Sequence, residues 1–248
     1  MGLNWKDIFH SALSSGGIEF TTENIHNRTV TYLNNGSIQI NLMDLTGNNG
    51  LLEQTLNRTN GEPQIIKLWE DIWALHSTKV LSRIVSITGM NKLTGARNCT
   101  AETLNKADAD LFLNKHHLQG SVNAKYRLGL RYKQDIVAVA TFSTRPMPER
   151  GEGYISAELI RFCSASGLTV TGGLSKLITF FNRTFHPNDI MTYADLDWST
   201  GESYEKLGFN YEGTTDPIVF WVDPVTMQRF QAHRLPLYIM DTVVTTLM

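Results

Sequence analysis

The sequence has little of what several classes of protein require. It holds two cysteines, Cys99 and Cys163, which are too few for a disulfide framework or a four-thiolate zinc site. No run approaches the ~20 consecutive apolar residues that a membrane span needs. The first residues also lack the order of basic and then apolar side chains that marks a signal peptide. These absences predict a cytoplasmic protein with no metal site and no membrane partner.

Charge is also scarce and nearly balanced. Of the 248 residues, 19% are charged and 42% are hydrophobic, and the net charge is −2 with a pI near 6.4. This composition excludes a uniformly basic nucleic-acid coat and provides a core for one large domain or two small ones. Residues 1–66 hold three basic and six acidic side chains, whereas residues 115–150 hold seven basic and two acidic ones. An anionic partner, DNA or a nucleotide, would therefore meet residues 115–150; the alternative is solvated charge on a hairpin. The oligomeric state stays open.

Turn signals and periodicity divide the chain into two parts. The first part holds a hairpin around Asn34-Asn35-Gly36, with strands over 29–33 and 37–42, then a strand over 64–69 and a helix over 70–88. Gly89 and Gly95 interrupt this pattern. We therefore expect a small N-terminal α+β module over 1–95 and a second domain over 98–248.

The second domain alternates strands with helices. Strands are expected over 125–133, 136–142, 154–162, 190–195 and 217–222, and helices over 103–114 and 174–183. The first of these helices is expected to bury an apolar face made of Leu104, Ala107, Leu111 and Phe112. A polar loop covers 145–153, a capping box of Ser199 and Glu202 starts a short helix that Gly208 ends, and the run 235–248 is either strand or helix. Helices between neighbouring strands predict an α/β fold, a mixed sheet flanked by helices.

A glycine turn between a strand and an amphipathic helix is the first candidate site. It consists of Thr171, Gly172, Gly173, Leu174 and Ser175. Paired glycines let backbone N–H groups approach a ligand, and a helix start carries partial positive charge, which together suit a pyrophosphate. The alternative is a plain glycine turn.

The second candidate site follows the strand over 190–195. A strand period of two places Tyr193 and Asp195 on one face at its end, just before Asp197 and Trp198. Trp198, beside two aspartates, is the candidate for stacking on a substrate. Upstream, Arg161 either holds an anionic group or braces its own strand.

The run Tyr204–Phe209 (Tyr-Glu-Lys-Leu-Gly-Phe) resembles the closing motif of the GNAT (GCN5-related N-acetyltransferase) superfamily. In that family, the strand, glycine loop and helix upstream hold the pyrophosphate of acetyl-coenzyme A, and 172–177 occupies this place. The resemblance implies an acetyl-CoA or other acyl-CoA donor. It makes Tyr204 the acid that protonates the departing thiolate, unless Tyr204 is a core aromatic. The base would be Glu158, Asp195 or His117.

A narrower resemblance is to phage DNA-modification proteins of the Mom type, themselves GNAT-like. It rests on the runs 159–162, 175–177, 192–195 and 201–204, and on Asn114–Gly120, where those proteins have a His-Tyr pair. This resemblance implies modification of a base in DNA. The adjacent His116 and His117 are not expected to chelate one metal together, because neighbouring side chains point in different directions. One of them is a candidate base or phosphate contact, and the alternatives are a structural or surface role and a metal ligand.

A third resemblance, over about residues 64–222, is to phage homing-endonuclease-like proteins. Their nuclease modules end in a strand and helix like Ile65–Trp73, and some continue into a GNAT-like region with the motifs found here. It implies a mobile-element or phage context, in a bacterial or phage-infected cell, and a degenerate nuclease-like N-terminal module. The residues available before Gln64 for a nuclease centre are Glu19, Glu23, His26, Asp44 and Glu53, in no recognised spacing.

The residues and the resemblances together predict an enzyme, a GNAT-type group transferase that uses an acyl-CoA-like donor and acts on a nucleic acid or nucleotide. The rival is a non-catalytic DNA- or protein-binding module that keeps the fold.

Overall fold

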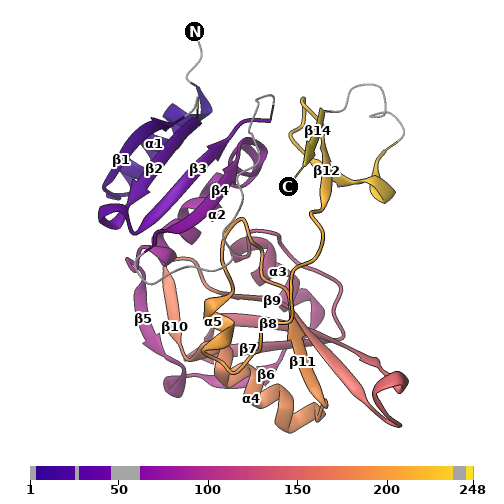
Figure 1. The fold of residues 1–248 in the computed structure, drawn as a ribbon. Helices are drawn as coiled ribbons and strands as arrows, with labels where there is room; N and C mark the ends of the chain where they lie inside the picture. The colour runs from indigo at the N-terminus through magenta and orange to yellow at the C-terminus, as the bar shows by residue number, and fades with distance from the viewer. Residues whose placement is uncertain (1–3, 26–27, 46–61, 237–243, 248) are drawn as a thin grey trace. The chain divides into compact units, whose positions relative to one another are not determined.

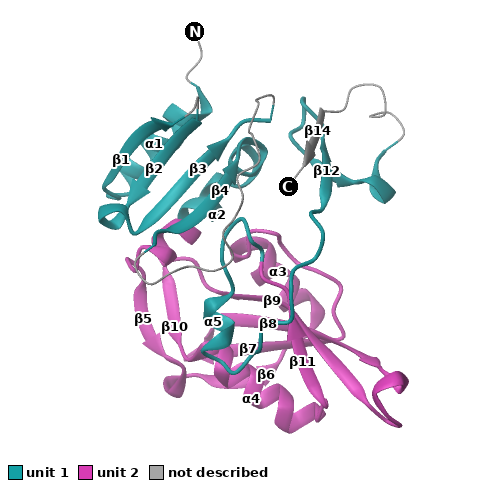
Figure 2. Ribbon diagram, in the orientation of Figure 1, with its two compact units in different colours: residues 1–81, 195–248 teal, residues 82–194 magenta. Residues whose placement is uncertain are grey.

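The structure is a computed structural model, and it describes residues 4–25, 28–45, 62–236 and 244–247. The chain forms two compact units, coloured separately in Figure 2. Unit 1 comprises residues 1–81 and 195–248, and unit 2 comprises residues 82–194. The expected boundary between residues 95 and 98 concerns sequence modules and stays a prediction. Within the described residues, no helix is long and apolar enough to cross a membrane.

A four-stranded sheet forms the first half of unit 1 (Figure 1). Its strands, in spatial order, are β1 (Phe20–Ile25), β2 (Arg28–Leu33), β3 (Ile38–Met43) and β4 (Gln64–Trp69). The first three are antiparallel and β4 is parallel to β3. The predicted hairpin is confirmed: Asn34 and Asn35, at φ 47° and 54°, make the left-handed turn that asparagine tolerates.

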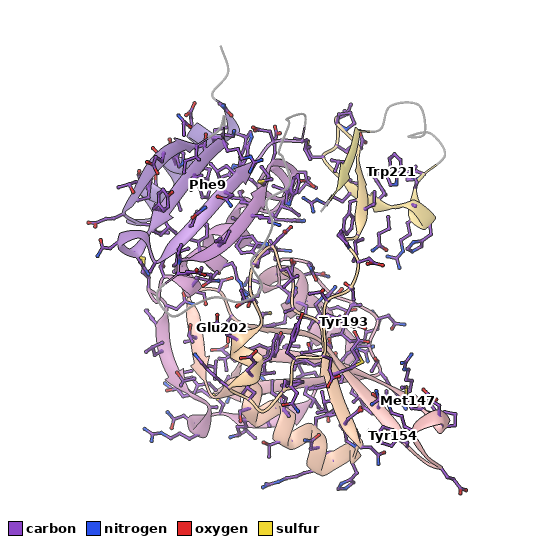
Figure 3. The ribbon with its side chains drawn as sticks, viewed as in Figure 1. Phe9, Met147, Tyr154, Tyr193, Glu202 and Trp221 are labelled. Carbon is purple, nitrogen blue, oxygen red and sulfur yellow. The ribbon has the colours of Figure 1, made fainter. Side chains whose placement is uncertain are left out.

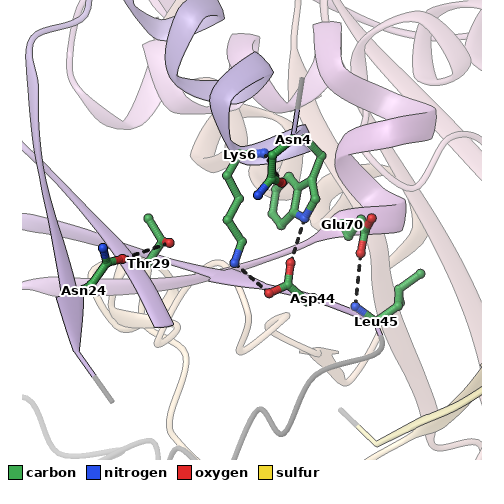
Figure 4. Close-up of polar contacts among 8 residues, drawn as sticks. Asn4, Lys6, Asn24, Thr29, Asp44, Leu45 and Glu70 are labelled. Atoms are coloured by element: carbon green, nitrogen blue, oxygen red, sulfur yellow. Dashed lines mark hydrogen bonds and ion pairs between the residues drawn. The ribbon is translucent and has the colours of Figure 1, made fainter. Parts of the chain in front are cut away.

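Two helices pack with this sheet. In α1 (Trp5–Ser15), Phe9 and Leu13 are buried, and the Phe9 ring meets the Trp73 ring edge-on at 5.1 Å. The predicted helix after β4 is confirmed as α2 (Glu70–Ile87). Side chains tie these elements together at the end of β3: Asp44 accepts a hydrogen bond from Trp5 Nε1 at 2.8 Å and pairs with Lys6 at 2.6 Å (Figure 4).

The returning end of the chain completes unit 1. Its elements are α5 (Glu202–Glu205) and a three-stranded sheet ordered β13 (Arg229–Gln231), β12 (Val219–Val222) and β14 (Val244–Leu247). The capping box was wrong: the N-cap of α5 is Gly201, at φ 89°, and the Ser199 hydroxyl accepts the Gly201 N–H at 3.1 Å. The run 235–248, left open between strand and helix, contains strand β14, while 237–243 and 248 lie outside the described residues.

A buried ion pair joins the two halves of unit 1. The carboxylate of Asp71, fully buried in the first turn of α2, receives two hydrogen bonds from the guanidinium of Arg229 on β13. The guanidinium also lies 5.8 Å from the Trp69 ring centre and 5.7 Å from that of Phe220. Charge pairing and cation–π contact therefore hold the C-terminal hairpin to the N-terminal sheet.

A five-stranded mixed sheet is the centre of unit 2. Its strands, in spatial order, are β11 (Asp189–Thr192), β9 (Ile155–Ser164), β8 (Asp135–Pro146), β7 (Tyr126–Tyr132) and β6 (Thr100–Thr103). Only the β9–β11 pair is parallel. A separate parallel pair is formed by β5 (Lys92–Gly95) and β10 (Leu168–Thr171). Short 3-10 turns lie at Ala96–Asn98 and Pro148–Arg150 in unit 2, and at Asn34–Gly36 and Ala232–Arg234 in unit 1.

Helices cover opposite faces of this sheet, which confirms the expected mixed α/β class. The Phe181 ring of α4 (Gly173–Phe185) stacks on Phe142 of β8 at 4.1 Å. On the other face, α3 (Lys106–His116) packs its buried residues in one cluster with Val139 of β8. Val139 and Phe142 are three residues apart on β8, so their side chains point to opposite faces of the sheet. The two helices therefore cover opposite faces, which we name the α3 face and the α4 face.

The expected apolar face of α3 was wrong in part. The helix buries Ala109, Phe112 and Leu113, whereas Leu111 is 72% exposed. It begins after Asn105, whose side chain accepts the Asp108 N–H at 2.8 Å, because an asparagine N-cap satisfies a free amide of the first turn.

Candidate active site

Three rows of side chains cross the α3 face of the unit 2 sheet. Cross-strand pairing defines them. The arginine row is Arg127, Thr141 and Arg161; the Glu158 row is Ser143, Glu158 and Met191; the Arg145 row is Arg145, Ser156 and Asp189. Successive rows are two residues apart along β8, which is about 7 Å. The Glu158 row therefore lies between two rows that contain arginine, and the other carboxylate of this surface, Asp189, belongs to the Arg145 row.

A bulge in β9 creates this arrangement. Phe142 pairs with Leu159 and Thr141 pairs with Arg161, so Ile160 is an extra residue with no partner on β8. Without it, Glu158 and Arg161 would point to opposite faces. The bulge also marks a fork: β11 ends at Thr192, opposite Leu159, while β9 continues to Ser164.

A pocket of about 130 Å³ opens on the Glu158 and Arg145 rows. It is lined by Ser143, Arg145, Ser156, Ala157, Glu158, Met191 and Tyr193. Glu158 and Tyr193, both predicted site residues, thus come together, and Tyr193, labelled in Figure 3, is 61% exposed. Tyr193 follows the last residue of β11, so the expected strand to Asp195 was too long and its face argument does not reach Asp195.

Sequence reasoning missed Arg145 in this pocket. The expected strand stopped at residue 142 and a loop was expected from 145, whereas β8 continues to Pro146 and pairs Arg145 with Ser156. The signal was present, because Thr141, Ser143 and Arg145 continue the period of two on one face. The end of β8 was missed because its last residues are mostly polar and half-buried or exposed, and therefore lack the apolar pattern of a buried strand.

Asp189 holds the start of β11 against β9 beside the pocket. Its Oδ2 accepts hydrogen bonds from Arg150 Nη1 at 2.6 Å and the Tyr154 hydroxyl at 3.0 Å, and its Oδ1 accepts one from the Ser156 hydroxyl at 2.5 Å. Tyr154 is labelled in Figure 3. This network engages both carboxylate oxygens and sets the position of the parallel strand whose end lines the pocket.

The predicted glycine turn lies at the N-terminus of α4. Gly172 is the N-cap at φ 73°, with no side-chain cap, and Thr171 ends β10 just before it. The first intrahelical bond runs from the Lys176 N–H to the Gly172 carbonyl. Within the described part of the chain, the N–H groups of Gly173, Leu174 and Ser175 find no acceptor. Three amides with partial positive charge are therefore available to an anion.

Gly173 is needed for packing as well. A Cβ there would lie 3.1 Å from Val170 Cβ and 3.4 Å from Leu130 Cδ1, so α4 starts in close contact with the strands. Lys176, one turn on, does not face a ligand with its charge: its Nζ donates to the carbonyls of Ala96, at 3.0 Å, and Cys99. Burial raises the pKa of the Cys99 thiol, and the Lys176 charge partly opposes that shift.

His116 and His117 lie at the end of α3 with different partners. The Nδ1 atom of His116 accepts the Ser166 N–H at 3.0 Å, so the neutral ring fastens α3 to the turn before β10. Burial lowers the pKa of His116, and the nearby Lys115 lowers it further. His117 is the C-cap, and its Nδ1 accepts the Gln119 N–H at 3.2 Å. His116 completes the buried face of α3, four residues after Phe112, a spacing that the sequence already contained.

The remaining predicted site residues belong to unit 1. Tyr204 lies on α5, half-buried, with its ring edge-on to Phe209 at 5.7 Å. Asp195 is exposed and its Oδ1 accepts the Asp197 N–H at 3.1 Å. Their predicted roles as acid and base stay predictions.

Asp197 and Trp198 are fastened to the edge strand β4. The Asp197 carbonyl accepts the Lys67 N–H at 2.8 Å, its Oδ2 accepts the Trp69 indole N–H at 3.0 Å, and the Trp198 carbonyl accepts the Gln64 amide at 3.0 Å. Burial raises the pKa of Asp197, as does the Asp195 charge, against the opposing effects of Lys67 and the Trp69 bond. Trp198 is 6% exposed, so its ring belongs to a packed interior, and its predicted stacking on a substrate stays a prediction.

No group of three or more histidine, cysteine or acidic side chains that could hold a metal occurs in the described ranges. Among the residues considered for a nuclease centre, Asp44 is engaged by Trp5 and Lys6, and His26 and Glu53 lie outside the described residues. Next to Asp44, the Leu45 N–H donates a hydrogen bond of 3.2 Å to the carboxylate of Glu70 at the start of α2 (Figure 4).

No family model and no curated protein matches the sequence. Solved structures match about half of it. An aminoglycoside acetyltransferase from an uncultured soil metagenomic sample, in complex with trehalose, matches 48% of this chain and 93% of its own at 15% identity and TM-score 0.40. A transcriptional regulator from Bacillus halodurans C-125 matches 47% of this chain and 97% of its own, at 16% identity and TM-score 0.39. A ribosomal-protein-alanine N-acetyltransferase from Brucella melitensis biovar Abortus 2308 matches 47% of this chain and 96% of its own, at 15% identity and TM-score 0.37. The sequence identity and the TM-score are low in all three comparisons.

Proposed function

We propose that the protein is a GNAT-type acyltransferase that moves an acyl group from an acyl-CoA to an amine. One observation carries the proposal: unit 2 combines a helix start with three unused amides, at Gly173, Leu174 and Ser175, and a pocket that contains a carboxylate, Glu158. The first suits a pyrophosphate and the second suits an amine that must lose a proton. The order of strand, glycine turn, helix and parallel strand is the one the resemblance implies.

The residues would divide the chemistry as follows. The amides at the start of α4 would hold the pyrophosphate of coenzyme A, which supplies an acyl group activated as a thioester. Glu158 would accept the proton that the amine loses as its nitrogen bonds to the acyl carbon. Tyr204 would donate a proton to the sulfur as the carbon–sulfur bond breaks. Asp195 or His117 would be the base if Glu158 is not, and Arg161 would help to hold an anionic group.

Ser175→Asp tests the coenzyme site. A carboxylate in the first turn of α4 favours the helix dipole and should keep or raise stability, but it repels a pyrophosphate. With the wild type, millimolar acetyl-CoA or coenzyme A should raise the melting temperature through mass action. We expect this rise to shrink strongly in Ser175→Asp and to persist in Thr179→Asp, one turn further along the exposed side of the same helix. No rise with the wild type would refute the proposal.

Glu158→Gln and Tyr204→Phe test the chemical roles. Each should lower kcat by roughly 10²–10⁴, the usual contribution of a positioned acid or base. Both should keep the thermal shift with acetyl-CoA, because neither residue belongs to the turn at 171–175. Unchanged turnover in Tyr204→Phe would remove Tyr204 as the acid, and unchanged turnover in Glu158→Gln would move the role of base to Asp195 or His117.

A second candidate is action on nucleic acid, as a Mom-like base modifier or as a binding module without catalysis. One observation favours it: of the seven basic residues in 115–150, only Arg131 and Arg150 form ion pairs with residues that the structure describes. An altered base in DNA from cells that express the protein, found by mass spectrometry, would support a modifier. DNA retention that falls steeply with salt, without any response to acetyl-CoA, would support the binding module.

A further inference from the structure

The pocket on the α3 face presents one anion and one cation that do not neutralise each other. Glu158 and Arg145 both line it, and neither forms an ion pair with any residue in the described ranges. Their rows are neighbours, about 7 Å apart along the strands. The two charges are therefore placed to meet two different groups of one ligand.

The acid nearest to Arg145 along its row is already engaged. Asp189 lies two strands away in that row, and its two carboxylate oxygens accept hydrogen bonds from Arg150, Tyr154 and Ser156. Arg145 itself lies at the exposed end of β8. Its guanidinium can thus form the paired hydrogen bonds with a carboxylate or phosphate that this group makes best.

The surroundings disfavour a ligand with several positive charges. The arginine row, with Arg127 and Arg161, lies on the other side of the Glu158 row, so rows that contain arginine flank Glu158 on both sides. The other carboxylate, Asp189, already accepts hydrogen bonds on both oxygens. A polyamine would place its second ammonium group beside one of these side chains. The volume of about 130 Å³ suits a small molecule, and Met191 and the exposed Tyr193 add an apolar wall.

We propose that the acceptor is a small amine that also carries an anionic group, with its nitrogen at Glu158 and its carboxylate or phosphate at Arg145. This inference rests on the proposed function for the transfer step, but the binding preference is a property of the pocket alone. Arg145 is then the residue that determines acceptor specificity.

Matched ligands of one length test the preference without any acyl donor. Calorimetric titration would compare 4-aminobutyrate, 4-aminobutan-1-ol and butane-1,4-diamine, with 3-aminopropyl phosphate to separate phosphate from carboxylate. The acidic ligands should bind about 10–100-fold more tightly than the alcohol, the usual gain from charge-assisted hydrogen bonds, and the diamine should bind more weakly than the alcohol. Whichever acidic ligand binds more tightly identifies the anionic group.

Variants locate the effect. Arg145→Gln should remove the advantage of the acidic ligands, and Arg145→Lys should keep part of it. Lys115→Gln, which removes an equal charge from the exposed side of α3, should keep all of it. The inference would be overturned if the diamine bound as tightly as the alcohol or more tightly. It would also be overturned if the acidic ligands kept their advantage over the alcohol in Arg145→Gln. Preference for acidic ligands without any thermal response to acetyl-CoA would instead refute the acyltransferase and leave the acceptor pocket in place.

Discussion

Glu158 and Arg161 lie three residues apart on β9, yet they belong to the same face of the sheet. The register accounts for this: Glu158 pairs with Ser143 and Arg161 with Thr141, two β8 residues that share the α3 face. The extra residue between these pairs, Ile160, shifts the alternation by one. A carboxylate and a guanidinium that a regular strand would separate therefore take part in one surface.

Gly129 on β7 is predicted to be essential for seating α3. A Cβ there would lie 2.7 Å from Leu104 Cδ1, in the buried cluster that α3 forms on the sheet. Gly129→Ala should therefore lower the free energy of unfolding by about 1–3 kcal/mol through overpacking. Gly95→Ala is the control, because its Cβ would meet Arg97 Cγ at an ordinary 3.5 Å. Urea unfolding of both variants measures the difference, and equal stabilities would contradict the packing.

The Asp71–Arg229 pair should cost more to break than to replace. Arg229→Met leaves the Asp71 carboxylate buried without its partner, a loss of about 3–5 kcal/mol in comparable pairs. The double variant Asp71→Leu with Arg229→Met should recover much of this loss, because no charge then stays buried. A thermodynamic cycle from urea unfolding gives the coupling. If the two single losses simply add, the pair does not clamp the C-terminal hairpin.

His116 should make stability fall in mild acid. Its pKa is lowered, chiefly by burial, so between the ordinary pKa near 6.5 and the folded value the unfolded chain binds more protons. The stabilising contribution is present above pH 6.5 and is lost as the pH falls through that interval. His116→Asn should flatten this part of the profile while its amide oxygen can still accept the Ser166 N–H. An NMR titration that gives His116 a pKa above 6.5 would refute the expectation.

The contribution of Asp197 to stability should depend on pH in the opposite direction to that of His116. Burial raises its pKa, so the folded chain binds more protons in the interval above the ordinary value of about 3.9, and stability falls as the pH rises through it. Asp197→Asn removes the charge and keeps an oxygen for the Trp69 indole, so we expect equal or higher stability at pH 7. Asp197→Ala, which leaves the indole N–H without this acceptor, should be less stable than Asp197→Asn. Melting temperatures of the wild type and both variants between pH 4 and pH 8 measure these effects. If Asp197→Asn were clearly less stable than the wild type at pH 7, the buried Asp197 charge would not be destabilising.

Elements with strong local signals were predictable from the sequence. The Asn-Gly step located the β2–β3 hairpin, apolar periodicity located α2 and α4, and the alternation over 125–133 located β7. The strands missed were short or poorly patterned: β1 is exposed over five of its six residues, and β5, β6 and β10 have four residues each. Such strands are stabilised by pairing with distant partners, which leaves no periodic trace in the chain itself.

The candidate site divides in the same way. Local residue pattern was enough to locate the glycine turn before α4 and to single out Tyr193, because turn chemistry and strand endings are properties of a few consecutive residues. Glu158 was a candidate only through the family resemblance, as one of three possible bases beside Asp195 and His117. That Glu158, Arg145 and Tyr193 line one pocket, that a bulge adds Arg161 to their face, and that Asp197 is held by β4 depended on pairing between segments far apart in sequence. Long-range pairing decides register, and register decides which side chains share a face.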